Sequence, residues 1–251
     1  MTNNKGYSII VLLIVFLLIG LAYLFSFRGN KVAVENILGD TGLIDDSQSD
    51  NPYIQALDAA KKVKLMQMKP ISEADHYLGN LDAPVKIIYY SDFECPFCPD
   101  YVENLKKIMH YDTNRQIVFA FRHFILNGHS LAYDAAMASE CASEQGAFWE
   151  MYNKLYQNNR EHNLGSETYL KNAKDLDLNI EKFSACMESN KYAGKIQTSI
   201  NEAKSYGVSG TPSTYINGKS YPGAYPYEDF VDQLGKEKKG LKTIIKEALE
   251  K

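Results

Sequence analysis

Residues 85–98 read VKIIYYSDFECPFC, and the class of fold follows from this one segment. Its first half, 85–90, is β-branched and aromatic and starts just after Pro84, which predicts a strand. A helix to about His110 is expected after the two cysteines, because apolar residues recur there on one helical face. Residues 116–121 have the pattern of a second strand. A strand, a helix and a strand in this order form a crossover that places the two strands parallel.

The flanking segments extend this unit into a larger α/β domain. Residues 76–78 predict a short strand on the N-terminal side, and a helical stretch is expected from about 131 to 206. After it, 213–216 and 219–225 predict two strands joined by Asn217-Gly218, a strong hairpin signal. Two helices are then expected to close the chain, the last with an apolar face over 241–249.

Cys95 and Cys98 are the candidate reactive groups. They stand between a buried-type strand and a helix, so Cys95 is expected at the helix N-terminus. Free backbone N–H groups and the positive end of the helix dipole favour a thiolate there, and the thiolate is the attacking species. Cys98, which is expected to be less exposed, would resolve the mixed disulfide formed by Cys95. Pro96 and Pro99 fit this geometry, because a missing N–H costs little in a first helical turn.

Two other interpretations of the cysteines remain open. Cys95, Cys98, Cys141 and Cys186 together offer four thiolates to zinc, although the long separations of the last two are unlike compact zinc modules. An inert structural disulfide between Cys95 and Cys98 is the second alternative. The strand and helix on either side of the pair favour a redox-active disulfide over both.

The segment Ser91-Asp92-Phe93-Glu94-Cys95-Pro96-Phe97-Cys98 resembles the active-site signature of the DsbA-like branch of the thioredoxin superfamily. The similarity extends over about 75–235 and includes LGN at 78–80, APV at 83–85, RHF at 122–124, ECA at 140–142, FW at 148–149 and GVSGTP at 207–212. The resemblance implies an α/β thioredoxin fold with an inserted helical domain at about 129–206. It also implies disulfide exchange through Cys95 and Cys98, with Pro96, Phe97, Thr211 and Pro212 as supporting residues of the active site.

Two further features are implied by the resemblance. Pro212 is expected to be a cis proline that faces the active site, preceded by Thr211, where the backbone pairs with a bound substrate strand. Cys141 and Cys186 are expected to form a second, structural disulfide, as similar cysteines do in some relatives. Two buried free thiols are the alternative for this second pair, since cysteine is among the most buried residue types.

Two positions depart from the family pattern. Tyr89 stands where many relatives carry an acidic residue, so a buried proton acceptor for Cys98 is either missing or replaced by Glu94 or water. Phe97 stands where strongly oxidising relatives often carry histidine, so the expected reduction potential shifts toward less oxidising values.

Composition argues against several classes of function. The net charge is -4 and the sequence pI about 5.8, with no basic stripe, so nucleic-acid binding is not expected. The five histidines lack metal-ligand spacing; His123 and His129 follow a strand and are expected in packing or capping roles, with a place near the active site as the alternative. The basic run 236–239 is interpreted as a solvated helix end. Neither a metal nor a cofactor is expected.

The N-terminal segment, 1–27, bears on the compartment. Residues 7–27 carry no charged side chain and match the roughly 20 apolar residues that span a bilayer. They predict a transmembrane anchor, with a cleaved signal segment as the alternative. A polar spacer is expected over 28–70, with a helix at about 53–66, and the globular domain over 71–251. The flanking charges are nearly balanced, so the oxidising chemistry of the cysteine pair is what places the domain outside the cytoplasm.

The leading hypothesis for function is a protein-disulfide oxidoreductase on the periplasmic side of the inner membrane, either anchored or free in the periplasm after signal cleavage. Its substrates would be reduced cysteines of exported proteins. The resemblance also implies a membrane redox partner of the quinone-linked type that reoxidises the Cys95–Cys98 pair. The alternatives are a disulfide reductase or isomerase, which Thr211 before the proline keeps open, and a non-catalytic binding protein on a thioredoxin scaffold.

Overall fold

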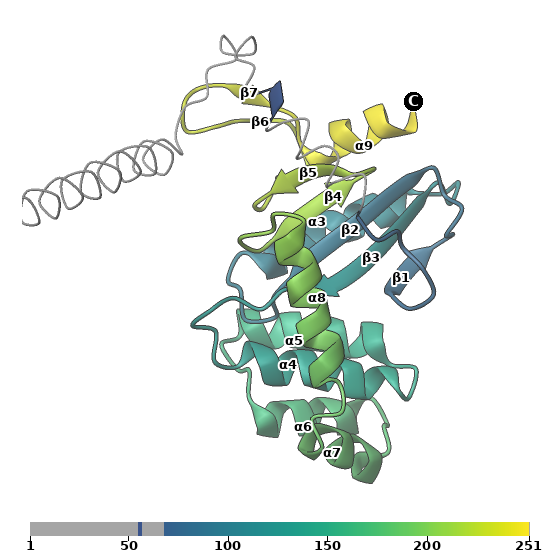
Figure 1. Cartoon of the computed structure of the whole chain (residues 1–251), viewed down its shortest axis with the longest axis vertical. Helices are drawn as coiled ribbons and strands as arrows, with labels where there is room; N and C mark the ends of the chain where they lie inside the picture. The colour runs from purple at the N-terminus through teal and green to yellow at the C-terminus, as the bar shows by residue number, and fades with distance from the viewer. Residues whose placement is uncertain (1–54, 57–67, 251) are drawn as a thin grey trace, which may run out of the picture. The chain divides into compact units, whose positions relative to one another are not determined.

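The computed structural model describes residues 55–56 and 68–250 (Figure 1). Five strands form one mixed sheet in the order β1-β3-β2-β4-β5. β2 (Val85–Ser91) and β3 (Ile117–His123) run parallel in its centre, joined by helix α3 (Cys98–Tyr111). The remaining strands are antiparallel to their neighbours: β1 (His76–Gly79), β4 (Ser213–Ile216) and β5 (Lys219–Pro222). The expected β-α-β unit is thereby confirmed.

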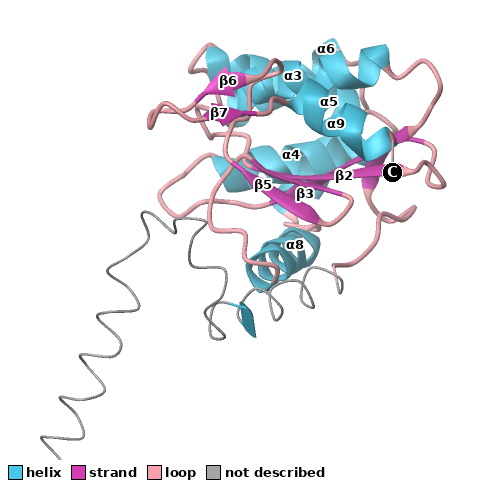
Figure 2. Ribbon diagram, turned by 90° about the horizontal axis from the view of Figure 1, so that it is seen from above, coloured by secondary structure: helices cyan, strands magenta, loops and turns pink. Residues whose placement is uncertain are grey.

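Helices cover both faces of the sheet. α3 and α9 (Leu241–Leu249) lie on one face, and α8 (Ala193–Ser205) lies on the other (Figure 2). The other four helices gather at one end of the sheet and form the expected helical insertion (Figure 1): α4 (Ala132–Ser143), α5 (Phe148–Arg160), α6 (Ser166–Asp175) and α7 (Ile180–Glu188). The α/β architecture with a helical insertion is confirmed.

The two central strands are buried on both faces. Their sequences are nearly continuous runs of apolar and aromatic residues, as expected for parallel strands covered by helices on each side. Tyr89 and Tyr90, on opposite faces of β2, are both fully buried, and Tyr89 is paired in register with Phe121 of β3. The core therefore reaches both sides of the strand that leads into the cysteine pair.

Helix α5 packs against this core through one aromatic face. Phe148, Tyr152 and Tyr156 recur every four residues along it, which places them on a single side of the helix. Phe121 of β3 packs edge-on against Tyr152, with ring centroids 5.3 Å apart. Phe93 packs against Tyr156 at 4.9 Å. These contacts hold the insertion against the end of β2, beside the candidate reactive cysteines.

A disulfide joins two helices of the insertion. Cys141 of α4 and Cys186 of α7 are bonded, with the two Cα atoms 5.8 Å apart. Cys95 and Cys98 are free thiols, so the structure represents the dithiol form of that pair.

The β4–β5 hairpin turns at Asn217-Gly218, as the sequence predicts. Both residues have positive φ, 47° and 80°, which is the geometry that favours Asn-Gly in two-residue hairpins. The Asn217 side-chain oxygen also accepts a hydrogen bond from the backbone N–H of Lys86, at 2.7 Å. The turn is therefore tied to the neighbouring strand β2.

The prediction of two closing helices is wrong for the first of them. Residues before α9 form a small hairpin of β6 (Phe230–Val231) and β7 (Glu237–Lys238) instead. Asp232 organises its turn, because one side-chain oxygen accepts from the N–H groups of Leu234 and Lys236. The basic run at 236–239, interpreted as a helix end, consequently lies in and around β7.

The chain divides into two units, residues 1–60 and 61–251. In the first unit only residues 55–56 are described, and both are helical. The predicted anchor at 7–27 and the rest of the predicted helix at 53–66 lie outside the described residues. Within 55–56 and 68–250, no helix has the length and apolar character needed to cross a membrane.

Candidate active site

The cysteine pair lies where β2 gives way to α3. Helix α3 begins at Cys98, with Phe97 as its N-cap residue. Cys95, expected at the helix N-terminus, lies in the turn that directly precedes the helix, and its carbonyl accepts the N–H of Cys98 at 3.3 Å.

Cys95 faces the Thr211–Pro212 peptide bond, which is cis. The Cys95 thiol donates a hydrogen bond to the Thr211 carbonyl, at 3.3 Å. A hydrogen bond with the Cys98 thiol lowers the pKa of Cys95 to about 6, although burial of the sulfur acts in the opposite direction. Thr211 and Pro212 precede β4, so the pairing of β4 with β2 brings together two segments that lie far apart in the sequence.

Both thiols of the pair are buried, with Cys95 1% and Cys98 0% exposed, so they differ little in exposure and mainly in pKa. The Cys98 side chain is fully buried, and this burial raises its pKa well above the ordinary range. Hydrogen bonds with Ser91 and Tyr89 act in the opposite direction. The two thiols therefore differ strongly: Cys95 is mostly thiolate at neutral pH, and Cys98 stays protonated.

The surface of the site is formed by exposed residues of the same turn. Pro96 is exposed, and the Phe97 side chain is 66% exposed. The Thr211 hydroxyl, by contrast, is buried and has no hydrogen-bond partner in the described part of the chain. Exposed apolar surface beside a reactive thiol is suited to contact with a polypeptide.

Asp92, a buried carboxylate, holds the turn that carries Cys95. From the sequence, Asp92 was named only as part of the active-site signature and was assigned no role. Its two oxygens accept from the N–H of Glu94 at 2.8 Å and of Leu126 at 2.9 Å. The second oxygen also bonds His129 Nδ1, at 2.7 Å. His129 therefore lies beside the active-site turn, which was the alternative to a packing role.

Asn159 of α5 holds the same turn from the other side, and sequence reasoning missed it. Its side-chain amide donates to the carbonyls of Phe93, at 2.5 Å, and Cys95, at 3.0 Å. No local signal in the sequence marks this residue, because its partners lie more than sixty positions earlier. Glu94, one of the alternatives for a proton acceptor, uses its carboxylate to accept the N–H of Leu131 at 2.6 Å.

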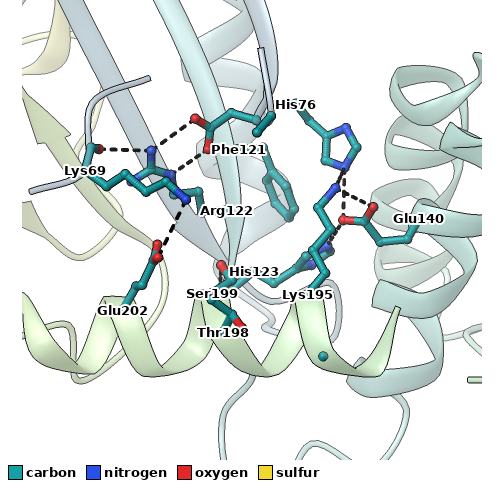
Figure 3. Close-up of a pocket in the computed structure, with 13 residues that line it drawn as sticks. Lys69, His76, Phe121, Arg122, His123, Glu140, Lys195, Thr198, Ser199 and Glu202 are labelled. Atoms are coloured by element: carbon teal, nitrogen blue, oxygen red, sulfur yellow. Dashed lines mark hydrogen bonds and ion pairs between the residues drawn. The ribbon is translucent and has the colours of Figure 1, made fainter. Parts of the chain in front are cut away.

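The RHF and ECA motifs meet in a second cluster of charges (Figure 3). Glu140 is buried, and one oxygen accepts from ring nitrogens of His76 at 2.9 Å and His123 at 3.0 Å. Lys195 of α8 binds the other oxygen at 2.7 Å. Burial by itself would raise the Glu140 pKa, but the hydrogen bonds from His123 and His76 outweigh it and hold the pKa well below the usual range.

This charge cluster lines a cavity of about 430 Å³ together with Lys69, Asp75 and Arg122. Each cation in it has a carboxylate partner, as Arg122 binds Asp75 and Lys69 lies near Glu202. Among the described residues, no group of three or more histidine, cysteine or acidic side chains is arranged to hold a metal ion. We interpret the cluster as a set of ion pairs and hydrogen bonds that holds β1, β3, α4 and α8 together.

The difference between the two thiols gives a measurable pH dependence. Alkylation of the reduced protein is expected to modify Cys95 with a midpoint near pH 6, rather than near the ordinary cysteine value of about 8.5, because only the thiolate reacts. Cys98 should stay unmodified across the same range. The rate is measured by mass spectrometry after timed quenching, and a midpoint near the ordinary value would contradict the assignment.

Comparison with known proteins gives one family. A family model described as thioredoxin matches residues 72–236. Among curated proteins, the Na(+)/H(+) antiporter NhaA 3 of Salinispora tropica is 35% identical over 163 residues, which cover 64% of this chain and 24% of the antiporter. NhaA 1 of Mycolicibacterium gilvum is 32% identical over 183 residues, which cover 71% of this chain and 29% of the antiporter. The chain thus spans about a quarter of the length of these curated relatives.

Solved structures share the fold. BdbD of Bacillus subtilis, in its oxidised form, has a TM-score of 0.61 at 19% identity and covers 73% of this chain and 97% of its own. The thiol-disulfide exchange protein alpha-DsbA2 of Wolbachia pipientis has a TM-score of 0.59 at 18% identity, and the match covers 78% of this chain and 97% of alpha-DsbA2. The catalytic domain of Proteus mirabilis ScsC has a TM-score of 0.57 at 22% identity, and the match covers 78% of this chain and 98% of the ScsC domain.

Proposed function

This chain belongs to the thioredoxin family, and on that premise we propose that it is a thiol–disulfide oxidoreductase of the DsbA-like type that works through Cys95 and Cys98. One observation carries the proposal, namely the inequality of the two thiols. Both sulfurs are buried, but Cys95 has a pKa of about 6 and lies beside exposed Pro96 and Phe97, whereas the pKa of Cys98 is raised well above its ordinary value. A nucleophile and a resolving thiol need this division of properties.

The exchange follows from these positions. In the oxidised protein, a substrate thiolate attacks the Cys95 sulfur, a mixed disulfide forms, and the Cys98 sulfur leaves with the electron pair and takes up a proton. A second substrate thiolate then attacks its partner sulfur in the mixed disulfide. The products are an oxidised substrate and the reduced Cys95–Cys98 pair, so two electrons pass from the substrate to the protein. Thr211 and Pro212 hold the substrate chain against Cys95.

We infer that the direction of flow is oxidation of the substrate. A stabilised Cys95 thiolate favours the reduced form of the pair, which makes its disulfide a better oxidant. The pKa of about 6 lies between those of the reactive cysteines of DsbA, about 3.5, and thioredoxin, about 7, so a moderate oxidant is expected. The absence of a histidine at position 97 is consistent with this moderate strength.

The proposed substrates are reduced cysteines of exported proteins, and the proposed compartment lies outside the cytoplasm. The Cys141–Cys186 bond supports this compartment, because structural disulfides persist mainly where the surroundings are oxidising. We propose that residues 7–27 attach the chain to the membrane, so that the domain faces the periplasm close to a quinone-linked membrane partner that reoxidises Cys95–Cys98.

The reduction potential of the pair tests the direction. Glutathione titration of the full chain in detergent should give a value above about -180 mV, the benchmark of disulfide isomerase. A value near that of thioredoxin, about -270 mV, would instead indicate a reductase that receives electrons from outside. A pair that does not titrate would remove the enzymatic proposal and leave the non-catalytic binding protein.

A further inference from the structure

Two consecutive asparagines, Asn158 and Asn159, lie in the last turn of helix α5. Asparagine forms helices less readily than alanine or leucine, and each of these two residues is only 8% exposed. Buried side-chain amides are expected to have hydrogen-bond partners. Neighbouring positions on a helix point about 100° apart, so the two amides face different surroundings.

The Asn159 amide faces the turn that carries the nucleophile. Its nitrogen donates to the Phe93 carbonyl at 2.5 Å and to the Cys95 carbonyl at 3.0 Å. Both acceptors are carbonyls, so the NH2 group and not the amide oxygen must face them, and its two hydrogens can serve both at once. One side chain of the helical insertion thus fixes two carbonyls of the active-site turn.

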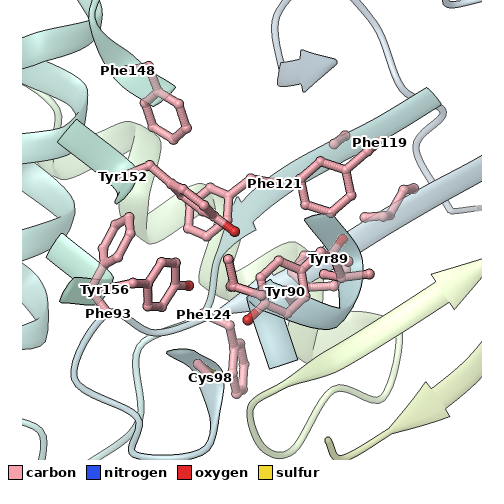
Figure 4. Packing of buried hydrophobic residues seen from close by; sticks show 14 of the residues in the cluster. Tyr89, Tyr90, Phe93, Cys98, Phe119, Phe121, Phe124, Phe148, Tyr152 and Tyr156 are labelled. Atoms are coloured by element: carbon pink, nitrogen blue, oxygen red, sulfur yellow. The ribbon is translucent and has the colours of Figure 1, made fainter. Parts of the chain in front are cut away.

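The two carbonyls belong to residues of the core, where water cannot readily replace this amide. Phe93 and Cys95 are each 1% exposed, and the Phe93 ring packs against Phe121 and Tyr156 (Figure 4). A buried carbonyl that loses its donor is costly, so the backbone would move toward another partner. Loss of the amide is therefore expected to shift the turn.

The backbone of Cys95 is held on both sides. Its N–H donates to the Asp92 carbonyl at 3.2 Å, and its own carbonyl accepts from Asn159. Only rotation about the Cα–Cβ bond then remains to place the sulfur, which lies 3.3 Å from the Thr211 carbonyl. Asn159 comes from α5 and Thr211 from the segment before β4, so two distant parts of the chain define where the sulfur lies.

Arg160, the next residue of α5, makes a similar contact at the surface. Its guanidinium donates to the Pro99 carbonyl in the first turn of α3, at 2.6 Å. The Arg160 side chain is 38% exposed, so water can take the place of this bond. The buried bonds of Asn159 are therefore the contact at this end of α5 for which solvent is a poor substitute.

We propose that Asn159 is a positioning residue for the nucleophile, through which the helical insertion fixes the place and the reactivity of the Cys95 sulfur. The proposal rests on the disulfide exchange proposed above and concerns the step that involves this sulfur. Starting from the reduced protein, the Cys95 thiolate bonds to one sulfur of a disulfide, the bond between the two sulfurs breaks, and the other sulfur leaves with the electron pair.

This step depends on position because the attacking sulfur must line up with the bond that breaks. A turn without the Asn159 amide holds Cys95 less well, which slows the attack. Two carbonyl dipoles without a donor would also disfavour a thiolate beside them. The same geometry serves the opposite direction, in which the Cys95 sulfur is attacked or released, since both directions pass through one transition state.

Rapid mixing with an aromatic disulfide that releases a coloured thiolate measures the attack, in the full chain with Cys95 and Cys98 reduced. At about pH 8 Cys95 is mostly thiolate, since its pKa is about 6, so the rate of the first release reports position rather than ionisation. Asn159→Leu, which has a similar size and no donor, should slow this release by at least about tenfold. The pH midpoint for alkylation of Cys95 should also rise by at least about half a unit.

Asn158→Leu is the matched control. Asn158 is equally buried, but its side-chain oxygen accepts from Asn172 of α6 at 2.6 Å, within the insertion. Both variants lose a buried hydrogen bond of α5, and only Asn159→Leu should change the attack rate and the midpoint. Equal changes in the two variants would show a general disturbance of α5 and overturn the proposal, as would wild-type values in Asn159→Leu.

Asn159→Ala is the second test in case leucine prevents folding at this position. It removes the same donors with a smaller side chain, so the same two changes are expected. A folded Asn159→Ala protein with the wild-type rate and midpoint would refute the positioning role. A wild-type protein that releases no coloured thiolate would instead refute the proposed exchange itself, so the two failures are distinguishable.

Discussion

Substitution of Cys95 by serine is expected to abolish disulfide exchange completely. A serine hydroxyl forms no disulfide and stays protonated at neutral pH, while Cys98 is fully buried and has a raised pKa, so it cannot take over as the nucleophile. The measurement is oxidation of a reduced dithiol peptide by the pre-oxidised full chain, followed by mass spectrometry. Exchange that continues above the rate without protein would contradict the assignment of Cys95.

Cys98→Ser gives the matched comparison with the opposite outcome. Cys95 remains reactive in this variant, so it should attack a substrate disulfide but fail to release it. A stable mixed disulfide on Cys95 is therefore expected to accumulate, visible as a mass increase that a reductant reverses. Absence of this adduct, in a variant that still contains the Cys141–Cys186 bond, would argue that Cys98 is not the resolving thiol.

Substitution of Glu140 by glutamine is expected to lower the free energy of unfolding by about 3 kcal/mol. Glu140 is buried and is the common partner of His76, His123 and Lys195, which come from three different elements. Loss of the carboxylate charge leaves these three groups without their shared anion. Denaturant unfolding of the oxidised protein, monitored by circular dichroism, measures the difference.

Glu144→Gln is the control for Glu140→Gln, because both glutamates lie near the C-terminal end of α4. Glu144 follows α4 by one residue and binds Lys191 at the surface, at 2.8 Å, so its loss should cost less than about 1 kcal/mol. An equal loss of stability in both variants would contradict a special role for Glu140.

The pH dependence of the Glu140→Gln effect has a defined sign. The folded state holds the Glu140 pKa far below its unfolded value, so the carboxylate contributes stability above the unfolded value of about 4.3. That contribution is lost as the pH falls toward the folded pKa. The difference between wild type and Glu140→Gln should therefore be constant near neutral pH and shrink below about pH 4. A difference that grows with acidity would refute the argument.

Much of the fold could be predicted from local patterns. The strand at 85–91, the hairpin turn at 217–218 and the closing helix at 241–249 all carry a periodicity or a turn signal within a few residues. The expected first of the two closing helices was wrong, because the residues before α9 form a short hairpin held by Asp232, which carries no such periodicity.

In the candidate site, too, the residues that are neighbours in the chain could be predicted and the distant ones could not. Cys95, Cys98 and the residues between them were evident because they are adjacent in the chain, and the resemblance to relatives directed attention to Thr211 and Pro212. The distant groups that pack against the active-site turn were not evident. Tyr156 and Asn159 lie about sixty positions after the cysteines, and nothing in their neighbours marks them.

The sequence alone determined that a strand, a reactive cysteine pair and a helix follow one another, since side-chain periodicity and turn preferences act over a few residues. Tertiary structure decided which distant groups surround that pair. Folding brings α5 against the end of β2, so that Asn159 holds the turn and the Tyr156 hydroxyl bonds that of Ser91 at the end of the strand. The electrostatics of a buried thiol depend on groups within a few ångströms in space, and proximity in space is set by packing rather than by distance along the chain.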